Sequence, residues 1–451
     1  MLGIFDHYNE MTKVLMKSLE TANISYTPLF VHYDGELPED ALSPFTYYTK
    51  TAQAGSELFF NEVPVPEYAE IRQEKELFGE ILQNGYLIGK INYRPNSYRR
   101  VQSVDWLLRD MKTSHTDFYN QYGNCYATSY YHNGTPYQKV YYRDEAEILG
   151  VNLRSGFITL LDGGKRYGFA NLTDFFCFFM DELHMKALYM KALYMKEDRI
   201  LINSLSYPLF ITRRRAKRPN TILFWQEKLR DKAPENMAEE LLRPKALTDI
   251  VFFNEEYREK IAAEYPSTNL KLNYLSHIGQ FAKKEEYDSK RAFILTNSDQ
   301  IAYLETLLSS FPGLTISVAA LTRMSEKLHG LTARYPNLVL YPTINQKGIA
   351  AELQKASVYL DFNAGGQVLE VVKAAYYNNL LVLALITSAK AADYSLNYET
   401  VDELIKVLSG VLNNPKERAE RLTELHQKQG VLSTAEDYEV LLDLVHSENA
   451  C

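Results

Sequence analysis

The sequence predicts an α/β protein made of two Rossmann-like domains, with an antiparallel β-meander inserted in the first. Three observations predict this class. Apolar β-rich runs alternate with segments of helical spacing in the second half of the chain, an interrupted series of the same kind occupies the first half, and a tyrosine-rich stretch separates the parts of that series. With 451 residues, the chain is also too long for one ordinary core.

The second half carries the more regular pattern. Its expected strands are the apolar runs at 291–297, 314–320, 337–342, 357–363 and 380–386. The segments between them have helical spacing, so that Leu304, Leu307 and Leu308, for example, share one face. Strands and helices that alternate with short connections are typical of a parallel sheet with right-handed crossovers. We therefore assign residues 277–430 to Rossmann-like domain II.

The first half contains the same pattern with a long interruption. Its expected strands are 2–5, 26–31, 199–205, 221–226, 249–254 and 270–275, with a helix near 8–22. Apolar strands without polar alternation fit a parallel sheet that is buried on both faces. We assign residues 1–50 and 198–276 to Rossmann-like domain I. Residues 431–451 are expected to form a C-terminal helix, because Tyr438, Leu441, Leu442 and Val445 fall on one stripe.

The interruption, residues 51–197, has a different texture. The chain holds 34 tyrosines against 21 phenylalanines and 2 tryptophans, and many of the tyrosines lie between Tyr86 and Tyr142. Asn133-Gly134 and Asp162-Gly163-Gly164 are turn signals of antiparallel hairpins. We interpret this segment as an inserted antiparallel sheet, followed by an exit helix near 171–196. The exit helix contains a local duplication at 185–196, which we interpret as a helical surface segment.

Charge argues against nucleic acid as the main partner. The formal net charge is −8, whereas binding to phosphates needs clustered lysine and arginine. One basic run occurs, formed by Arg213, Arg214, Arg215, Lys217 and Arg218. We interpret this run as a solvated surface patch, with contact to anionic lipid or to a partner as the alternative.

Cysteine usage and hydropathy indicate the compartment. The three cysteines show no C-x-x-C spacing, which argues against structural zinc and a disulfide framework and fits a reducing compartment. The N-terminus lacks the pattern of a signal peptide. The longest apolar stretch, 380–386, is too short to span a bilayer. We therefore expect a cytoplasmic protein whose membrane contact, if it has any, is peripheral.

Most motifs that carry chemistry are absent from the sequence. It contains no P-loop, no G-x-G-x-x-G after a strand, no H-E-x-x-H, no D-x-D and no G-x-S-x-G. The nine histidines are scattered along the chain, and no spacing suggests a metal site. We therefore expect neither a cofactor nor a metal.

The most informative segment is 359–379. We expect a buried strand that ends at Asp361-Phe362-Asn363, a turn at 364–366, and a helix that begins near Gln367. Ligands of open α/β sheets bind at this edge, glycines let a backbone approach them closely, and a helix N-terminus attracts anions. The alternative is a tight connection without a ligand, and the pattern does not separate the two.

Several stretches resemble known families. The strand, Gly-rich turn and helix at 359–379 resemble the second domain of GT-B retaining glycosyltransferases. The opening FDHYNEMTKVLMKSLETA and the later VHYDGELPEDALSP resemble the GtfB family. Its members are the stabilising subunits of the GtfA–GtfB O-GlcNAc transferase, which belongs to the accessory Sec system for serine-rich repeat adhesins. The tyrosine-rich insertion and the length are also similar, so the resemblance spans nearly the whole chain and implies a GT-B-like fold.

The same resemblance bears on catalysis. Active members of the wider family carry two glutamates separated by seven residues at this turn; Glu370 matches the second, and Phe362 stands in place of the first. They also bring arginine and lysine to the sugar diphosphate, whereas the turn at 296–300 has no cation and contains Asp299, which would repel a diphosphate. These departures imply a chain that keeps the fold without the donor site.

The resemblance also implies partners. A GtfA-like catalytic subunit would transfer GlcNAc from UDP-GlcNAc to Ser or Thr, and this chain would join it in a heterotetramer and bind the serine-rich repeat adhesin acceptor. One alternative is a catalytically active retaining GT-B glycosyltransferase with a variant donor site. Another is a peptide-binding chaperone without a transferase partner; the missing cations argue against the first and the family-like N-terminus against the second.

Two sets of residues are expected to make these contacts. We expect the acceptor between the two Rossmann-like domains, at Asn363, Gly365, Gly366, Gln367 and Glu370. We expect the catalytic partner on the tyrosine-rich sheet, with edge-to-edge pairing as one mode. The tyrosines expected at that interface are Tyr126, Tyr130, Tyr131, Tyr137, Tyr141 and Tyr142.

Overall fold

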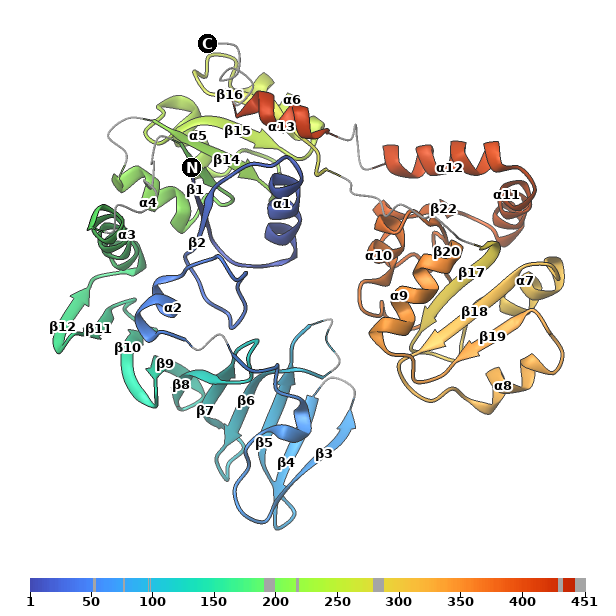
Figure 1. Cartoon of the computed structure of the whole chain (residues 1–451), viewed down its shortest axis with the longest axis horizontal. Helices are drawn as coiled ribbons and strands as arrows, with labels where there is room; N and C mark the ends of the chain where they lie inside the picture. Colours follow the sequence, from blue (N-terminus) through green and yellow to red (C-terminus); the bar gives the residue numbers. More distant parts are fainter. Residues whose placement is uncertain are drawn as a thin grey trace. The chain divides into compact units, whose positions relative to one another are not determined.

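The computed structural model describes residues 1–51, 54–75, 78–95, 97, 99–189, 199–215, 219–278, 288–428 and 433–442. The chain divides into two compact units (Figure 1). Unit 1 comprises Met1–His277 and Ala435–Cys451, and unit 2 comprises Ile278–Thr434. Each unit has a six-stranded parallel sheet, and unit 1 also has a ten-stranded antiparallel sheet. The fold class predicted from the sequence is therefore confirmed.

The parallel sheet of unit 1 has the strand order β16-β15-β14-β13-β1-β2. Its strands are β1 (Leu2–Phe5), β2 (Thr27–Phe30), β13 (Ile200–Ile202), β14 (Thr221–Trp225), β15 (Leu247–Phe252) and β16 (Lys271–Tyr274). The central strands are apolar along their length because helices cover both faces, and every residue of β14 is buried. The helices here are α1 (Glu10–Thr21), α2 (Pro44–Thr49), α4 (Tyr207–Arg215), α5 (Glu235–Leu242) and α6 (Glu255–Glu264).

The antiparallel sheet is a meander in which each strand pairs with its neighbours in sequence. Its strands are β3 (Ala69–Lys75), β4 (Phe78–Gln83), β5 (Tyr86–Tyr93), β6 (Val101–Leu107), β7 (Thr113–Tyr119), β8 (Cys125–His132), β9 (Thr135–Arg143), β10 (Ala146–Asn152), β11 (Ile158–Asp162) and β12 (Lys165–Phe169). Asn133-Gly134 joins β8 to β9, and Gly163-Gly164 joins β11 to β12. All four turn residues have positive φ angles, as the turn signals predicted.

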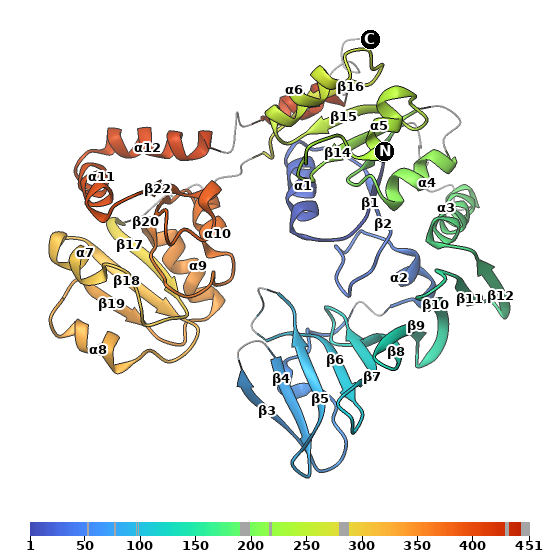
Figure 2. The same cartoon turned by 180° about the vertical axis from the view of Figure 1, so that it is seen from behind.

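The basic run belongs to α4, which packs against α3 (Leu172–Tyr189) in both views (Figures 1 and 2). Arg214 pairs with Asp174 at 3.0 Å, and Arg215 pairs with Asp181 at 2.7 Å. The described part of the run is therefore engaged with carboxylates of the protein itself. Lys217, Arg218 and the second part of the duplication lie outside the described residues.

Arg213, the first residue of the basic run, faces a buried carboxylate. Its Nε donates to Glu240 at 2.6 Å, and the Glu240 side chain is completely buried. Glu240 also accepts hydrogen bonds from the backbone N–H groups of Lys245, Ala246 and Leu247, at 3.0–3.1 Å. These donors outweigh the cost of burial and hold the Glu240 pKa below its usual value.

Unit 2 has the strand order β19-β18-β17-β20-β21-β22. Its strands are β17 (Asp288–Thr296), β18 (Thr315–Ala320), β19 (Leu338–Tyr341), β20 (Ala356–Asp361), β21 (Leu381–Leu385) and β22 (Leu396–Tyr398). Its helices are α7 (Leu304–Ser310), α8 (Glu326–Thr332), α9 (Gln346–Lys355), α10 (Val371–Tyr377), α11 (Val401–Asn413) and α12 (Pro415–Gln427). The short strand β22 was not predicted, because three residues carry too little pattern.

The chain returns to unit 1 through α13 (Ala435–Leu441), which packs on α1. Tyr438 is completely buried, and its hydroxyl donates to the backbone carbonyl of Ser276 at 2.9 Å. Arg199 donates to the carbonyl of Leu442 at 2.6 Å. Val445 of the predicted stripe lies outside the described residues. In the described ranges, no helix has both the length and the apolar character that crossing a membrane requires.

Candidate functional site

The turn after β20 is built around the side chain of Asn363, which is only 3% exposed. Its Oδ1 accepts hydrogen bonds from Thr296 Oγ1 at 2.8 Å and from Gly365 N at 2.9 Å. Its Nδ2 donates to Asn297 Oδ1 at 3.0 Å and to the Gly366 carbonyl at 2.9 Å. The whole amide is therefore used inside unit 2, so Asn363 shapes the turn and does not offer its polar atoms to a ligand.

The other predicted acceptor residues divide into two kinds. A Cβ on Gly365 would collide with the side-chain oxygen of Asn297, so a larger residue here would require Asn297 to move away from its hydrogen bond with Asn363. Gly366 and Gln367 are exposed, and a Cβ on Gly366 would meet open space. This second pair is the more exposed part of the turn.

The helix after this turn begins at Val371, not near Gln367 as the sequence predicted. Leu369 and Glu370 adopt positive φ angles of 50° and 49°, which a right-handed helix cannot contain. The Glu370 carboxylate pairs with Lys373 at 3.1 Å, within the first turn of α10. Because the helix begins four residues later, its N-terminus does not coincide with the glycines.

The residues at the expected donor position are apolar or acidic. Phe362 is completely buried, so no carboxylate stands where the first family glutamate would be. Asp361 before it is 2% exposed and accepts a hydrogen bond from the Lys390 backbone N–H at 2.6 Å. Burial raises the Asp361 pKa, and Lys390 partly offsets that rise. Asp299 of the turn at 296–300 is exposed.

The fold brings to this edge two cations that the sequence did not predict. Lys390 follows β21 and lies close enough to Asp361 to affect its titration, and Lys373 extends from α10. Both are distant in sequence from the turn at 296–300, so no local motif signals them. Each lies beside a carboxylate of the protein, and that negative charge weakens the attraction of the lysine for a diphosphate.

Two of the predicted interface tyrosines are buried within unit 1. Tyr126 is 5% exposed and its ring lies 4.7 Å from that of Tyr33, whereas Tyr141 is 6% exposed and its ring lies 4.6 Å from that of Phe45. Because side chains alternate along a strand, the sequence predicts on which face of the sheet each tyrosine lies. It does not predict which other residues cover that face. These two attach the antiparallel sheet to the first Rossmann-like domain, so they are not exposed to another chain.

The remaining four tyrosines keep some exposure. Tyr130 and Tyr142 approach each other with their hydroxyl oxygens 3.3 Å apart, and Tyr131 accepts a hydrogen bond from Thr116 at 3.2 Å. Tyr137 is 37% exposed. Its carbonyl accepts a hydrogen bond from Leu153 N at 2.9 Å.

Beside Tyr137 the turn between β10 and β11 exposes large apolar side chains that the sequence analysis missed. Leu153 is 42% exposed and Phe157 is 45% exposed. We call Tyr137, Leu153 and Phe157 the apolar corner of the antiparallel sheet. The sequence does contain a signal for this corner. Two large apolar residues flank the polar sequence Arg154-Ser155-Gly156, whereas solvated turns are usually built from small and polar residues.

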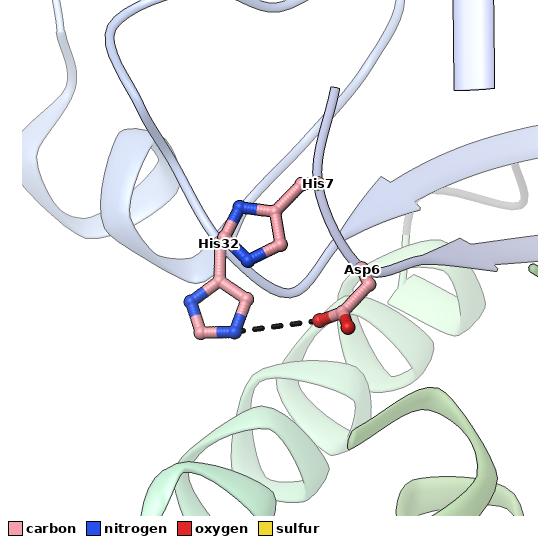
Figure 3. Close-up of side chains that lie close together, drawn as sticks. All are labelled: Asp6, His7 and His32. Carbon is pink, nitrogen blue, oxygen red and sulfur yellow. Dashed lines mark ion pairs between the residues drawn. The ribbon is translucent and has the colours of Figure 1, made fainter. Parts of the chain in front are cut away.

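The carboxyl edge of the unit 1 sheet gathers two histidines that looked scattered in the sequence (Figure 3). His7 follows β1 and His32 follows β2; their rings stack with centroids 4.2 Å apart and planes 7° apart. His7 Nδ1 lies 2.7 Å from Asp34 Oδ2, and His32 Nε2 lies 3.3 Å from Asp6 Oδ1. The hydrogen bond to Asp34 raises the His7 pKa, whereas burial lowers that of His32.

The protein is a GT-B-like α/β protein. This class is defined by two parallel six-stranded sheets, a meander within the first unit and a Gly-containing turn at the carboxyl edge of the second sheet. Four family models match successive parts of the chain. They describe the GtfB N-terminal domain (residues 2–48), the GtfB middle domain (69–170), the GtfB third domain (182–264) and the GftB/GlyA-F C-terminal domain (292–429).

Relatives and solved structures agree with these matches. The chain is 33% identical to the UDP-N-acetylglucosamine–peptide N-acetylglucosaminyltransferase stabilizing protein GtfB of Streptococcus parasanguinis, over 85% of this chain and 86% of that protein. It is 30% identical to the Streptococcus agalactiae protein of that name, over 98% and 99%. A chain of a crystallised GtfA/B complex bound to UDP and GlcNAc matches with a TM-score of 0.87 and 31% identity, over 98% of this chain and 99% of that one. The protein belongs to the GtfB family.

Proposed function

We propose that this chain is the non-catalytic stabilising subunit of a protein O-GlcNAc transferase and that it assembles with a catalytic subunit similar to GtfA. The observation that carries the proposal is the family relationship: the matched relatives are named as stabilising proteins of a peptide N-acetylglucosaminyltransferase. The partner would transfer GlcNAc from UDP-GlcNAc to Ser or Thr of a serine-rich repeat adhesin. We place the assembly in the cytoplasm, as a heterotetramer, either free or peripheral at the inner face of the membrane.

The carboxyl edge of the unit 2 sheet supports the non-catalytic part of the proposal. Departure of a nucleoside diphosphate needs preorganised positive charge and a suitably placed carboxylate. Here a buried Phe362 replaces the first family glutamate, and Asn363 closes the turn with its own hydrogen bonds. Lys373 and Lys390 near this edge favour the second candidate, an active retaining glycosyltransferase with a variant donor site.

The antiparallel sheet is the natural surface for the catalytic partner. Its two outer strands carry charges, Glu70 and Arg72 on β3 and Lys165 and Arg166 on β12. Charged edge strands oppose pairing with a further strand, so docking by edge pairing is the less favourable mode. The apolar corner offers exposed area without those charges, so we assign docking to it, with the exposed parts of Tyr130, Tyr131 and Tyr142 as further contacts.

The exposed part of the unit 2 turn is our candidate contact for the acceptor. Gly366 and Gln367 offer backbone groups and one amide side chain, which suit the hydroxyls and carbonyls of a Ser-rich peptide. Asn363 and Gly365 would contribute by holding the turn in shape, and Glu370 by its pairing with Lys373. Ordering a disordered acceptor costs entropy, so binding at this turn should be weak.

Coexpression with a GtfA-like catalytic subunit tests the assembly. We expect the two chains to copurify and the apparent Tm of the catalytic subunit to rise, because a partner that binds only the folded state stabilises it. Leu153→Glu with Phe157→Glu should weaken assembly at least about tenfold, since each places a charge in a dry contact. Leu242→Glu is the matched control, because Leu242 is an apolar residue of α5 that is 72% exposed. If the double variant assembles fully, the docking surface lies elsewhere on the chain.

A further inference from the structure

We propose that Asp6, His7 and His32 bind a divalent metal ion of borderline softness, with Zn²⁺ the best fit, at the carboxyl edge of the unit 1 sheet. One ligand atom from each of the three residues lies within 4.8 Å of the other two. Figure 3 shows the two imidazole rings close together, with the Asp6 carboxylate beside the His32 ring. Two imidazole nitrogens and one carboxylate oxygen form a donor set that suits zinc and leaves positions for water.

The backbone of all three residues is held by hydrogen bonds. The His32 N–H donates to the Asp6 carbonyl at 3.0 Å, which joins the ends of β1 and β2. The Asp6 N–H donates to Asn203 Oδ1 at 3.0 Å. Thr12 Oγ1 donates to the His7 carbonyl at 2.8 Å, and Asn203 in turn donates to Thr12 at 2.9 Å. Only side-chain rotations are therefore needed to complete the site, and precise placement of ligands favours binding.

An outer carboxylate already orients one ligand. Asp34 lies 2.7 Å from His7 Nδ1, which leaves His7 Nε2 as the nitrogen available to a metal. Histidine ligands usually make such a bond through their second nitrogen, because it fixes the tautomer and increases the basicity of the ligating one. Asp34 is distant from Asp6 and His7 in sequence, so these residues form no short motif that would identify a metal site from the sequence.

The one ligand carboxylate, Asp6, has an oxygen without a hydrogen bond among the described residues. Asp6 Oδ1 is buried and accepts no hydrogen bond from the described residues; His32 Nε2 is 3.3 Å away without the geometry of one. Glu227 adds a third acid near Asp6, while Lys139 supplies one cation near Asp34. A buried carboxylate oxygen without a donor is costly, and a cation beside it removes that cost.

The stacked rings define what has to change on binding. A metal ion lies close to the plane of each imidazole that holds it, and rings stacked with planes only 7° apart do not meet that condition together. Rotation of the His32 ring about its Cβ–Cγ bond, which keeps the His7–Asp34 hydrogen bond, lets both rings face one ion. Metal binding should therefore separate the two rings, and that separation is itself observable.

Titration of the untagged, EDTA-treated full chain with ZnCl₂, followed by calorimetry, tests the proposal. We expect one equivalent to bind, Co²⁺ to give the visible absorption of a low-coordinate site, and the zinc-bound protein to show a higher Tm by tryptophan fluorescence. Trp106 and Trp225 are the two tryptophans of the chain, and both lie in unit 1. Asp34→Asn should weaken binding about 10- to 100-fold, and His7→Gln more strongly.

His132→Gln is the control, because His132 is an exposed histidine of β8 away from the cluster. It should bind zinc as the unchanged chain does. His7 is 43% exposed, so His7→Gln should keep the fold, which far-UV circular dichroism checks. Absence of stoichiometric binding by the unchanged chain would overturn the proposal. Equal binding by the unchanged chain and by a folded His7→Gln, His32→Gln double variant would also overturn it, because the ion would then lie elsewhere.

Discussion

At the carboxyl edge of the unit 1 sheet, Asp6 and His32 follow neighbouring strands, and Asp6 keeps a buried carboxylate oxygen that accepts no hydrogen bond from the described residues. At the matching edge of the unit 2 sheet, Asn363 follows β20, and its side chain bonds to the turn that follows and to Thr296 and Asn297 at the end of β17. Both sheets are parallel and six-stranded, so topology alone does not produce the contrast. The residues just after the strands decide whether such an edge stays open to a ligand or is closed by the protein itself.

If the chain is non-catalytic as we propose, the closed edge explains how a glycosyltransferase-like fold persists without a donor site. A buried phenylalanine and a saturated amide stabilise unit 2 at the position where an enzyme would keep ionisable groups. Catalytic groups usually reduce stability because they are held desolvated or strained. Under the proposed function, replacing such groups with side chains that pack would increase the stability of unit 2.

Phe362→Glu attempts to restore the missing glutamate and should have the largest effect. We expect unit 2 to lose about 4 kcal/mol or more of stability, because the change removes a buried ring and introduces a charge into an apolar site. Far-UV circular dichroism should show the loss, whereas tryptophan fluorescence should not, since both tryptophans lie in unit 1. Phe362→Leu, the control, should cost much less. A stable Phe362→Glu protein that releases UDP would show that the closed edge is easily reopened.

Glu240→Gln and Asp361→Asn together compare two buried acids, one in each unit. Four donors surround Glu240, so the change should cost about 3 kcal/mol at neutral pH, whereas Asp361→Asn should cost under about 1 kcal/mol because Asp361 accepts fewer bonds. The pKa of Glu240 is lowered on folding, so its contribution is present above the unfolded value of 4.5 and is lost as the pH falls through the folded pKa.

The Asp361 pKa is raised on folding from 3.8, so its contribution is present below that value and is lost as the pH rises through the folded pKa. Denaturant titrations at several pH values between about 3 and 7 measure both effects. A pH-independent difference between Glu240→Gln and the unchanged protein would contradict the assignment of Glu240 as an ionised, donor-stabilised group.

Asn363→Ala removes the amide that closes the unit 2 turn. We expect a loss of about 2 kcal/mol, because Asn297 and the Gly365 N–H lose their buried partner. Gln367→Ala in the same turn is exposed and should stay within about 0.5 kcal/mol of the unchanged protein. Calorimetry of both variants gives the comparison. Equal stabilities would mean that the turn is not held by Asn363.

Gly366→Ala with Gln367→Ala should have the smallest effect, a reduction of a few-fold in the affinity for an unglycosylated Ser-rich peptide. Gly366 has open space for a Cβ, so the double variant should fold and assemble, whereas a larger residue at Gly365 would collide with Asn297 and disturb the turn itself. Because the turn residues are uncharged, affinity should change little with salt. Fluorescence anisotropy with a labelled peptide measures this. Unchanged affinity would remove this turn from the acceptor site.

The sequence predicted most of the architecture, because periodicity and turn chemistry are local. Buried strands such as 221–226 and the turn at Asn133-Gly134 were readable from a few residues each. The start of α10 was not, because Leu369 and Glu370 take positive φ angles that neither residue type favours.

The candidate sites were harder to predict because they join distant residues. His7 and His32 are brought together by adjacent parallel strands, and Lys390 reaches Asp361 from the loop after another strand. The tyrosines were predicted as one interface, yet Tyr126 and Tyr141 are covered by Tyr33 and Phe45 of the same unit. Alternation along a strand assigns faces, but only the packed fold decides which face remains exposed.

UDP release by the purified chain is the most direct measurement of the central claim that this GtfB-family protein supports transfer without catalysing it. The assay uses UDP-GlcNAc and a Ser-rich peptide, with the chain alone and with its catalytic partner. We expect release by the chain alone at the level of a blank, and release by the assembled pair that is unchanged by Glu370→Gln in this chain. Release by the chain alone that is well above the blank and abolished by Glu370→Gln would contradict it.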